Sequence, residues 1–171
     1  MRFASVFLLS LIASGSLVSP AVAQTRKVAS ATTAAPSAAK KSADPVRVFD
    51  IVANEDMKYS ATTLTVRRGE AVTIRLTGKG TLPKIAMAHN VVVLKLGTDI
   101  LKLLKDGAPS RATDFIPPSM MDAVIARTPF AGPGETVQVT FTAPTKPGKY
   151  PFICTFAGHY QGGMKGTLIV R

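Results

Sequence analysis

Three side chains with metal-binding atoms lie near the C-terminal end of this 171-residue chain. Four residues separate Cys154 from His159, and four more separate His159 from Met164. The loop that carries them contains glycines, so it can turn tightly and bring a thiolate, an imidazole and a thioether to one ion. Soft sulfur favours Cu(I) and imidazole also suits Cu(II), so this combination of donors is suited to copper.

A second imidazole is needed to complete a trigonal set of ligands, and the only other histidine of the chain is His89. It stands at the start of an apolar segment, where a rigid sheet could hold it against the loop. Taken singly, Cys154 would be a packed core thiol, Met164 core filler, His159 an exposed loop residue and His89 a polar residue at a strand end. Their joint occurrence favours a metal site over these plainer interpretations.

The N-terminal residues predict a signal peptide. Arg2 supplies a positive charge, residues 6–12 and 17–18 are mostly apolar, and residues 21–23 form an A-x-A cleavage pattern. We therefore expect residues 1–23 to be removed near Ala23 and the mature protein to lie in the periplasm, with a retained membrane anchor as the alternative. The apolar stretch falls short of the roughly 20 residues that span a bilayer, so stable membrane insertion is not expected.

Composition divides the rest of the chain in two. Residues 24–45 are mainly Ala, Ser, Thr, Lys and Pro, which cannot offset the entropy of ordering, so they predict a disordered linker. Residues 46–171 alternate apolar runs with turn residues and suit one domain. Cys154 is the only cysteine of a chain expected in an oxidising compartment, so it cannot form an intrachain disulfide and needs another role.

The formal net charge is +11, from 21 Lys and Arg residues against 10 Asp and Glu residues. Such a charge attracts acidic protein partners, anionic membranes or nucleic acid. The basic residues are scattered singly, without a basic helix or an aromatic-interleaved patch, and export separates the protein from nucleic acid. We therefore expect no nucleic-acid partner and interpret most of these charges as solvated surface.

Strand patterns recur through the domain. Residues 72–77 and 137–141 alternate apolar with polar side chains, so each is expected to bury one face. Further strands are expected at residues 46–52, 64–66, 90–94, 150–155 and 166–170, separated by Gly and Pro turns. About seven to eight short strands at this spacing predict an all-β, Greek-key β-sandwich, which we expect to be antiparallel.

Residues 97–127 differ and predict a small helical flap between two strands. Thr98 can cap a helix that ends at Gly107, and Ser119 with Asp122 resembles a capping box before a second helical stretch at residues 123–126.

The chain resembles the cupredoxin family of type 1 blue copper proteins, and within it azurin and the azurin-like auracyanins. Three segments carry the resemblance: residues 82–90 (LPKIAMAHN), residues 124–128 (VIART), which resemble the strand after the azurin flap, and residues 154–168 (CTFAGHYQGGMKGTL). The resemblance implies that His89 Nδ1, Cys154 Sγ and His159 Nδ1 form a trigonal plane around one copper ion. It also implies a weak axial contact from Met164 Sδ.

The resemblance extends to residues around these ligands. It implies a weak copper contact from the Ala88 carbonyl and a second layer in which Asn90 hydrogen bonds near Thr155 and ties the two ligand segments together. His159 would be the edge through which electrons leave, surrounded by an apolar docking patch of Met87, Phe156, Ala157 and Gly158.

The chain also departs from the azurin pattern. Ala88 and Ala157 stand where azurin has glycine and proline, and four residues separate His159 from Met164 where azurin has three. The azurin disulfide is absent, because the chain has a single cysteine.

The function implied is electron transport by a monomeric periplasmic protein that is not an enzyme. Its expected partners are redox proteins such as c-type cytochromes or copper reductases and oxidases. Copper oxidases and nitrite reductases need further histidine-rich centres, which two histidines cannot supply. A copper chaperone or storage protein and a metal-free adhesion-type sandwich remain as alternatives, and zinc could occupy the same cage.

Overall fold

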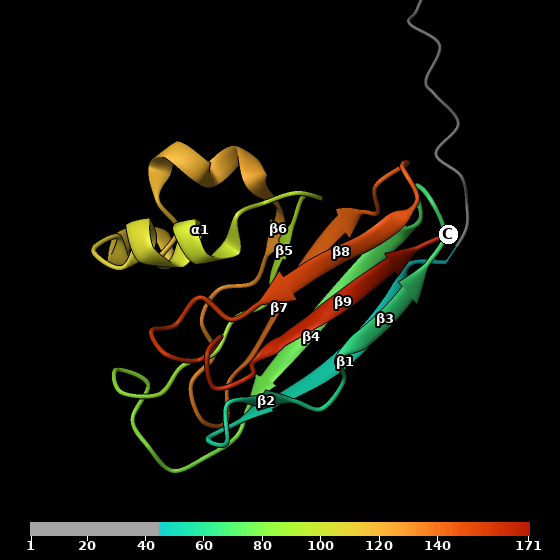
Figure 1. The fold of residues 1–171 in the computed structure, drawn as a ribbon. Helices are drawn as coiled ribbons and strands as arrows, with labels where there is room; N and C mark the ends of the chain where they lie inside the picture. Colours follow the sequence, from blue (N-terminus) through green and yellow to red (C-terminus); the bar gives the residue numbers. More distant parts are fainter. Residues whose placement is uncertain (1–44) are drawn as a thin grey trace, which may run out of the picture. The chain divides into compact units, whose positions relative to one another are not determined.

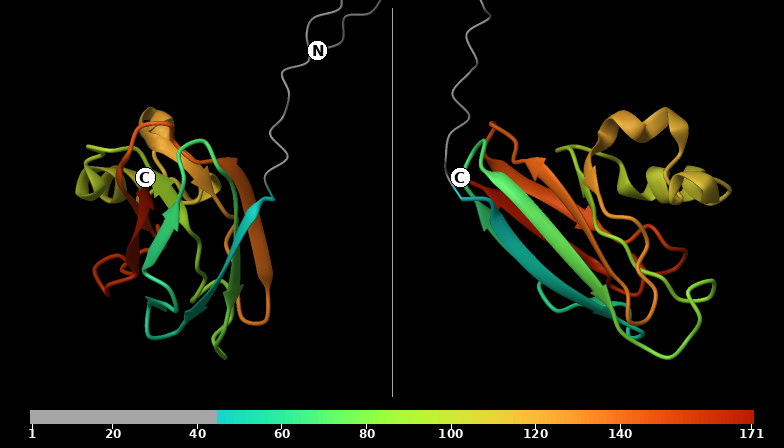
Figure 2. Two further views of the ribbon diagram at one scale, coloured as in Figure 1. Left: turned by 90° about the vertical axis from the view of Figure 1, so that its right-hand side faces the viewer. Right: turned by 180° about the vertical axis from the view of Figure 1, so that it is seen from behind.

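The structure is a computed structural model that describes residues 45–171. The predicted signal peptide, and the predicted linker up to residue 44, lie outside the described residues. Within the described part the strands form two sheets (Figures 1 and 2). The four-stranded sheet has the order β2 (Lys58–Tyr59), β1 (Arg47–Asn54), β4 (Ala71–Gly78), β7 (Thr136–Thr142). The five-stranded sheet has the order β3 (Thr63–Val66), β9 (Lys165–Val170), β8 (Gly148–Ile153), β5 (Val92–Leu94), β6 (Val124–Arg127).

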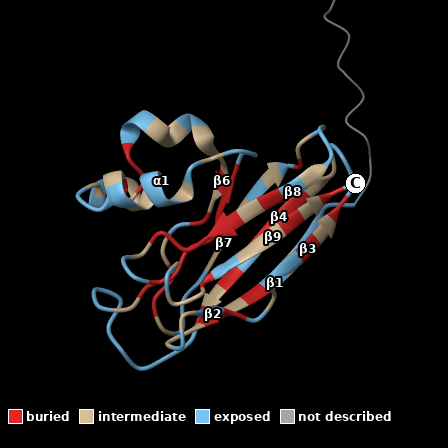
Figure 3. Ribbon diagram, in the orientation of Figure 1, coloured by how far each residue is buried: buried red, intermediate tan, exposed pale blue. Residues whose placement is uncertain are grey.

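Alternation along the strands builds the core between the two sheets. In β4, Val72, Ile74 and Leu76 are fully buried. Arg75 points the other way and pairs with Asp50 on β1, at 2.6 Å between Nε and Oδ1. Figure 3 shows the resulting buried and exposed bands along the strands. The predicted β-sandwich is confirmed, because side chains at every second position bury one face of each sheet.

Two details of the predicted sandwich are wrong. Residues 45–171 form nine strands, because the two-residue β2 and the strand β6 add to those expected from alternation. The sheets are also mixed rather than antiparallel, since β1 pairs with β4 and β3 pairs with β9 in parallel. Both parallel pairs join strands that no hairpin connects: the chain passes from β1 to β3 in the other sheet before returning as β4, and such crossovers permit parallel neighbours.

The flap between β5 and β6 contains α1 (Ile100–Gly107), the 3-10 helix η1 (Arg111–Thr113) and the 3-10 helix η2 (Pro118–Ala123). The end of α1 at Gly107 agrees with the prediction, but its cap does not. The Asp99 carboxylate accepts a hydrogen bond from the Lys102 N–H at 2.9 Å, whereas the Thr98 hydroxyl donates to the Lys95 carbonyl. Aspartate and threonine are both good cap residues, so the sequence pattern could not separate these neighbours.

The predicted capping box at Ser119 and Asp122 is wrong. These residues lie inside η2, which has no side-chain cap, and residues 124–127 form β6 instead of a helix. The β-branched Val124 and Ile125 favour a strand, and β6 pairs with β5. The strand that the family resemblance implied at this position is present. No helix among the described residues is long and apolar enough to cross a bilayer.

Close packing at Gly166 on β9 leads to a first prediction. A Cβ atom added there would lie 2.1 Å from the Phe152 ring, which is fully buried opposite it on β8. We expect Gly166→Ala to lower the free energy of unfolding by about 3 kcal/mol, because the ring has no free space to enter. Urea unfolding would measure the loss. Thr167→Ala, at the next, partly exposed position, is the control and should cost less than about 1 kcal/mol. Equal losses in the two variants would contradict the packing argument.

Candidate metal centre

The loop between β8 and β9 carries three of the predicted donors. Cys154 directly follows β8 and Met164 directly precedes β9. The Cys154 N–H donates to the Met164 carbonyl at 3.2 Å, and the Met164 N–H donates to the His159 carbonyl at 2.9 Å. Gly158 and Gly163 have φ angles of 85° and 99°, which side chains rarely adopt, so the closed shape of the loop depends on these glycines. These backbone bonds close the loop, so that Cys154 and Met164 at its two ends are hydrogen bonded to each other.

His89 arrives from the other sequence segment, just before β5. Its N–H donates to the Ala131 carbonyl at 2.9 Å, and the Ala131 N–H donates back at 2.8 Å. Two residues later the Val91 N–H donates to the Thr128 hydroxyl at 3.0 Å. The segment that follows β6 therefore fixes the position of His89, which is buried although it lies outside a named strand.

The donor atoms converge. The ligand atoms of His89, Cys154 and His159 lie within 4.8 Å of one another. Cys154 Sγ is 3.4 Å from His159 Nδ1, and the two imidazole rings are 4.9 Å apart between centroids. Met164 is also fully buried.

His89 tests whether a metal ion fits this place. Both of its ring nitrogens are buried, and neither has a hydrogen-bond partner among residues 45–171. A buried polar atom without a partner costs about 1–3 kcal/mol. An ion placed among these atoms would bind one of the nitrogens, and the surrounding thiol and imidazole are copper ligands. The residues present therefore fit a copper ion.

Burial also shifts the pKa values of these groups. It raises the pKa of the Cys154 thiol to about 12, although backbone N–H groups of Asn90 and Phe156 that hydrogen bond to the sulfur oppose the rise. Burial, with a smaller contribution from His89, lowers the pKa of His159 to about 4. It also lowers the pKa of His89, against the attraction of Glu55. Both imidazoles are therefore neutral at pH 7 and have a lone pair for a metal ion.

A buried hydrogen-bond network joins the two ligand segments. The Asn90 side chain donates to the Thr155 hydroxyl at 2.9 Å and accepts from the Thr155 N–H at 3.0 Å. Asn90 follows His89 and Thr155 follows Cys154, so these bonds hold two ligands at a fixed separation. The Tyr59 hydroxyl donates to the Asn90 carbonyl from β2, the strand that alternation did not predict. No sequence signal pointed to Tyr59.

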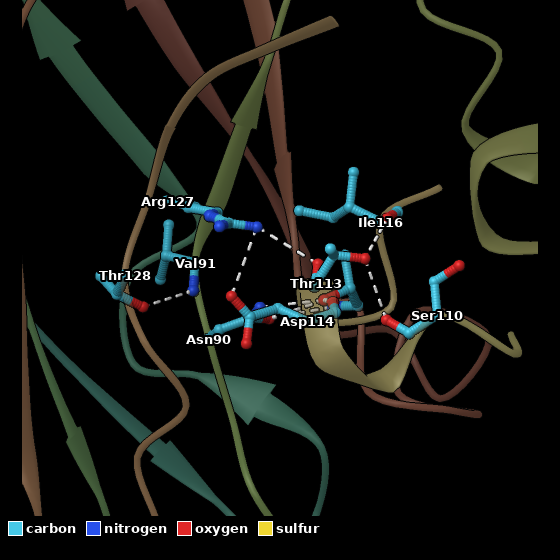
Figure 4. Close-up of polar contacts among 9 residues, drawn as sticks. Asn90, Val91, Ser110, Thr113, Asp114, Ile116, Arg127 and Thr128 are labelled. Carbon is cyan, nitrogen blue, oxygen red and sulfur yellow. Dashed lines mark hydrogen bonds and ion pairs between the residues drawn. The ribbon is translucent and has the colours of Figure 1, made fainter. Parts of the chain in front are cut away.

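The same network reaches the flap (Figure 4). The Thr155 hydroxyl donates to the Asp114 carbonyl at 2.6 Å. Arg127 on β6 pairs with the Asp114 carboxylate at 3.4 Å and donates to the Thr113 carbonyl at 3.2 Å. Asp114 and Phe115 both have left-handed backbones, with φ angles of 57° and 58°, so these contacts hold a strained turn in place. No sequence pattern pointed to this connection between the flap and the ligand loop.

An aromatic cluster covers the imidazole of His159. The Phe156 ring lies 4.7 Å from the His159 ring, and Phe115 and Phe130 pack edge-on against Phe156 at 5.8 and 5.7 Å. His159 itself is buried, with 2% of the residue exposed, and it directly follows the exposed Ala157 and Gly158. Of the predicted docking patch, Ala157 and Gly158 are exposed, whereas Met87 and Phe156 are partly buried. Phe115 and Phe130 were not predicted, because packing alone brings them here.

Comparisons with known proteins agree with this set of donors. Residues 47–171 match the family described as copper binding proteins, plastocyanin/azurin family. Auracyanin-B of Chloroflexus aurantiacus is 33% identical over 128 residues, which cover 74% of this chain and 53% of that protein, so the chain spans about half of this relative. Azurin of Pseudomonas aeruginosa is 37% identical over 126 residues, covering 71% of this chain and 83% of azurin. The structure of auracyanin A, described as a "blue" copper protein from Chloroflexus aurantiacus, matches with a TM-score of 0.66 and 33% identity, covering 74% of this chain and 100% of that chain.

Proposed function

The chain belongs to the plastocyanin/azurin family of copper-binding proteins, and on that basis we propose that it carries single electrons through one mononuclear type 1 copper site. The observation that carries the proposal is the buried cluster of His89, Cys154 and His159, whose donor atoms lie within 4.8 Å of one another. In this proposal these three residues hold copper in one plane and Met164 is the weak axial ligand. The Ala88 carbonyl is proposed as a further weak contact from the opposite side.

The rigidity of the donor set supports rapid electron transfer. When bound, copper supplies a one-electron couple between Cu(I) and Cu(II). The Ala131 contact holds His89, and the loop hydrogen bonds hold Cys154, His159 and Met164, so these side chains need not move when the charge of the site changes. The surrounding apolar residues exclude water. Little reorganisation is then required at each transfer, which is the property an electron carrier needs.

Because His159 is buried, an electron that leaves the site must pass the residues that surround its imidazole before it reaches the surface. Phe156 covers the imidazole, and Ala157 and Gly158 expose their surface next to it. We propose that a redox partner docks here, on the apolar docking patch of Met87, Phe156, Ala157 and Gly158. Partners of this kind include c-type cytochromes and copper reductases or oxidases.

The setting of the protein is part of the proposal. Residues 1–23 would direct export and be removed, residues 24–45 would form a linker, and residues 46–171 would act in the periplasm as a monomeric carrier that is not an enzyme. Export would bring the protein into an oxidising compartment, where a bound metal ion would protect its single thiol from oxidation.

Reconstitution of the domain with Cu(II) tests this function. We expect an intensely blue protein with a type 1 electron paramagnetic resonance spectrum, which loses and regains its colour reversibly when one electron per copper is added and removed. A protein that binds only Cu(I) and stays colourless would instead be a copper chaperone or storage protein. A domain that binds no copper would contradict both functions.

Met164 provides a more specific test of the axial position. We expect Met164→Leu to keep the blue colour and to raise the reduction potential by about 60 mV, which is a tenfold change in the ratio of Cu(I) to Cu(II) at a fixed redox poise. The reason is that leucine removes a weak donor and leaves the site apolar. Voltammetry would measure the shift. Met120→Leu, in the flap, is the matched control and should leave the potential unchanged. An unchanged potential in Met164→Leu would remove Met164 from the axial role.

A further inference from the structure

Two hollows that share Phe115 and Phe156 in their lining lie on the face formed by the flap, the ligand loop and the segment between β4 and β5. The first has a volume of about 380 Å³ and is lined by Phe115, Phe130 and Ile85, among others. The second has a volume of about 260 Å³ and is lined by Leu101, Ala157 and Gly158, among others. We call this surface the flap face.

The flap face exposes large apolar side chains. Ile85 is 65% exposed and Leu101 is 66% exposed, the highest values among the large hydrophobic residues of the described chain. Each lines one of the two hollows. Exposed apolar groups that gather around hollows, rather than singly, are typical of surfaces that bind another protein.

The charged residues that line the two hollows are all basic. Lys84 and Arg111 line the first hollow and Lys105 lines the second, and no acidic residue within residues 45–171 lines either one. Lys84 is partly neutralised, because its Nζ lies 2.6 Å from a carboxylate oxygen of Glu135. Arg111 and Lys105 form no salt bridge with any acid in the described part of the chain. Arg111 and Lys105 are therefore unpaired cations beside the aromatic cluster that contacts His159.

The framework of this surface is fixed. Phe115, Phe130 and Phe156 pack edge to face, and Arg127 with Thr155 holds the turn at Asp114 that presents Phe115. A partner that docks here therefore meets a shaped surface and loses little free energy in ordering it.

We propose that the flap face docks a redox protein whose own docking surface is acidic, with Arg111 and Lys105 selecting that partner by charge. This inference rests on the proposed electron-carrier function and adds the chemistry of the partner. An apolar centre with a charged rim gives a brief but oriented encounter, since the rim charges speed association and the centre excludes water.

Stopped-flow electron transfer tests the proposal on the copper-loaded protein. A reduced plant-type ferredoxin of net negative charge is the acidic probe, and a reduced cytochrome c of net positive charge is the basic probe. In each reaction one electron leaves the iron of the probe and reduces the Cu(II) form of this protein. The test variant is Lys105→Glu with Arg111→Glu. The control is Lys146→Glu with Lys149→Glu, which changes the net charge equally at the far end of β8, where the C terminus lies (Figure 1).

We expect the test variant to slow electron transfer from the ferredoxin at least tenfold at low ionic strength and to speed transfer from the cytochrome. The control should change either rate by less than about twofold, and high salt should remove the difference because it screens surface charges. Equal effects in the two variants, or no effect in either, would overturn the proposal. A blue colour in the oxidised form of every variant, and its reduction by dithionite, show that the copper site is intact. A copper-loaded, oxidised parent protein that is not blue would instead refute the electron-carrier function.

Discussion

Replacing Cys154 by serine is expected to abolish the blue absorption of the copper-loaded domain while leaving the domain folded. The colour requires a thiolate that donates charge to Cu(II), and serine offers a hard hydroxyl that keeps its proton at neutral pH. Serine occupies nearly the same volume, and the backbone N–H groups of Asn90 and Phe156 that contact the sulfur can contact its oxygen. We expect a loss of about 1–3 kcal/mol in the free energy of unfolding, because the site is fully buried.

Visible absorption, electron paramagnetic resonance and circular dichroism on one sample would separate loss of the site from loss of the fold. Met164→Leu serves as the control, because it alters the same loop and is expected to stay blue. A Cys154→Ser domain that remained blue would exclude the proposed ligand set. A parent domain without colour would exclude type 1 copper altogether.

The chemistry of the centre could be predicted from the sequence because the rare residue types are so few. With one cysteine and two histidines in the chain, only one cluster that combines a thiolate with two imidazoles was possible. Cys154 and His159 are also close in sequence, so their convergence needed only a tight loop. The position of His89 was a genuine long-range prediction, and the structure brings it to the loop.

The strands were predictable for a different reason. Alternation in β4 reports directly which side chains face the core, and it needs no knowledge of the partner strand. The parallel pairing of β1 with β4 could not be read in the same way, because register and direction depend on how the chain crosses between the sheets. The cap at Asp99 and the strand at residues 124–127 were missed because each depends on competition between neighbouring residues or on pairing with a distant strand.

What the sequence could not predict bears most on function. Phe115 and Phe130 lie far from Cys154 in sequence, and their contacts with Phe156 arise only when the flap, which carries Phe115, and the segment after β6, which carries Phe130, fold against the ligand loop. Both rings pack against Phe156, which contacts His159; Phe115 lines both hollows of the flap face and Phe130 lines the first. The same flap carries Arg111 and Lys105. A segment that was expected only as a helical insertion therefore determines how a partner would reach the metal centre.

Asn90→Ala is expected to have the second largest effect on the site. The substitution removes every hydrogen bond between the Asn90 side chain and Thr155 and leaves the buried Thr155 N–H without its partner. We expect a loss of about 3 kcal/mol in the free energy of unfolding, from the unsatisfied groups and the space left by the side chain. We also expect copper affinity to fall by about 10- to 100-fold, because His89 and Cys154 are no longer held at a fixed separation. Urea unfolding and competition with a chelator would measure the two effects.

Asn54→Ala is the matched control for Asn90→Ala. Asn54 lies at the end of β1, where its only side-chain hydrogen bond within the described residues is to Asp56 at 3.2 Å. It should lose less than about 1 kcal/mol and keep its copper affinity. The comparison separates a general loss of stability from loosening of the site, because the Asn90 side chain joins the two ligand segments and the Asn54 side chain does not. If Asn90→Ala weakened the fold but bound copper as tightly as the parent, the ligands would be held by their own backbone contacts, and Asn90 would have a purely structural role.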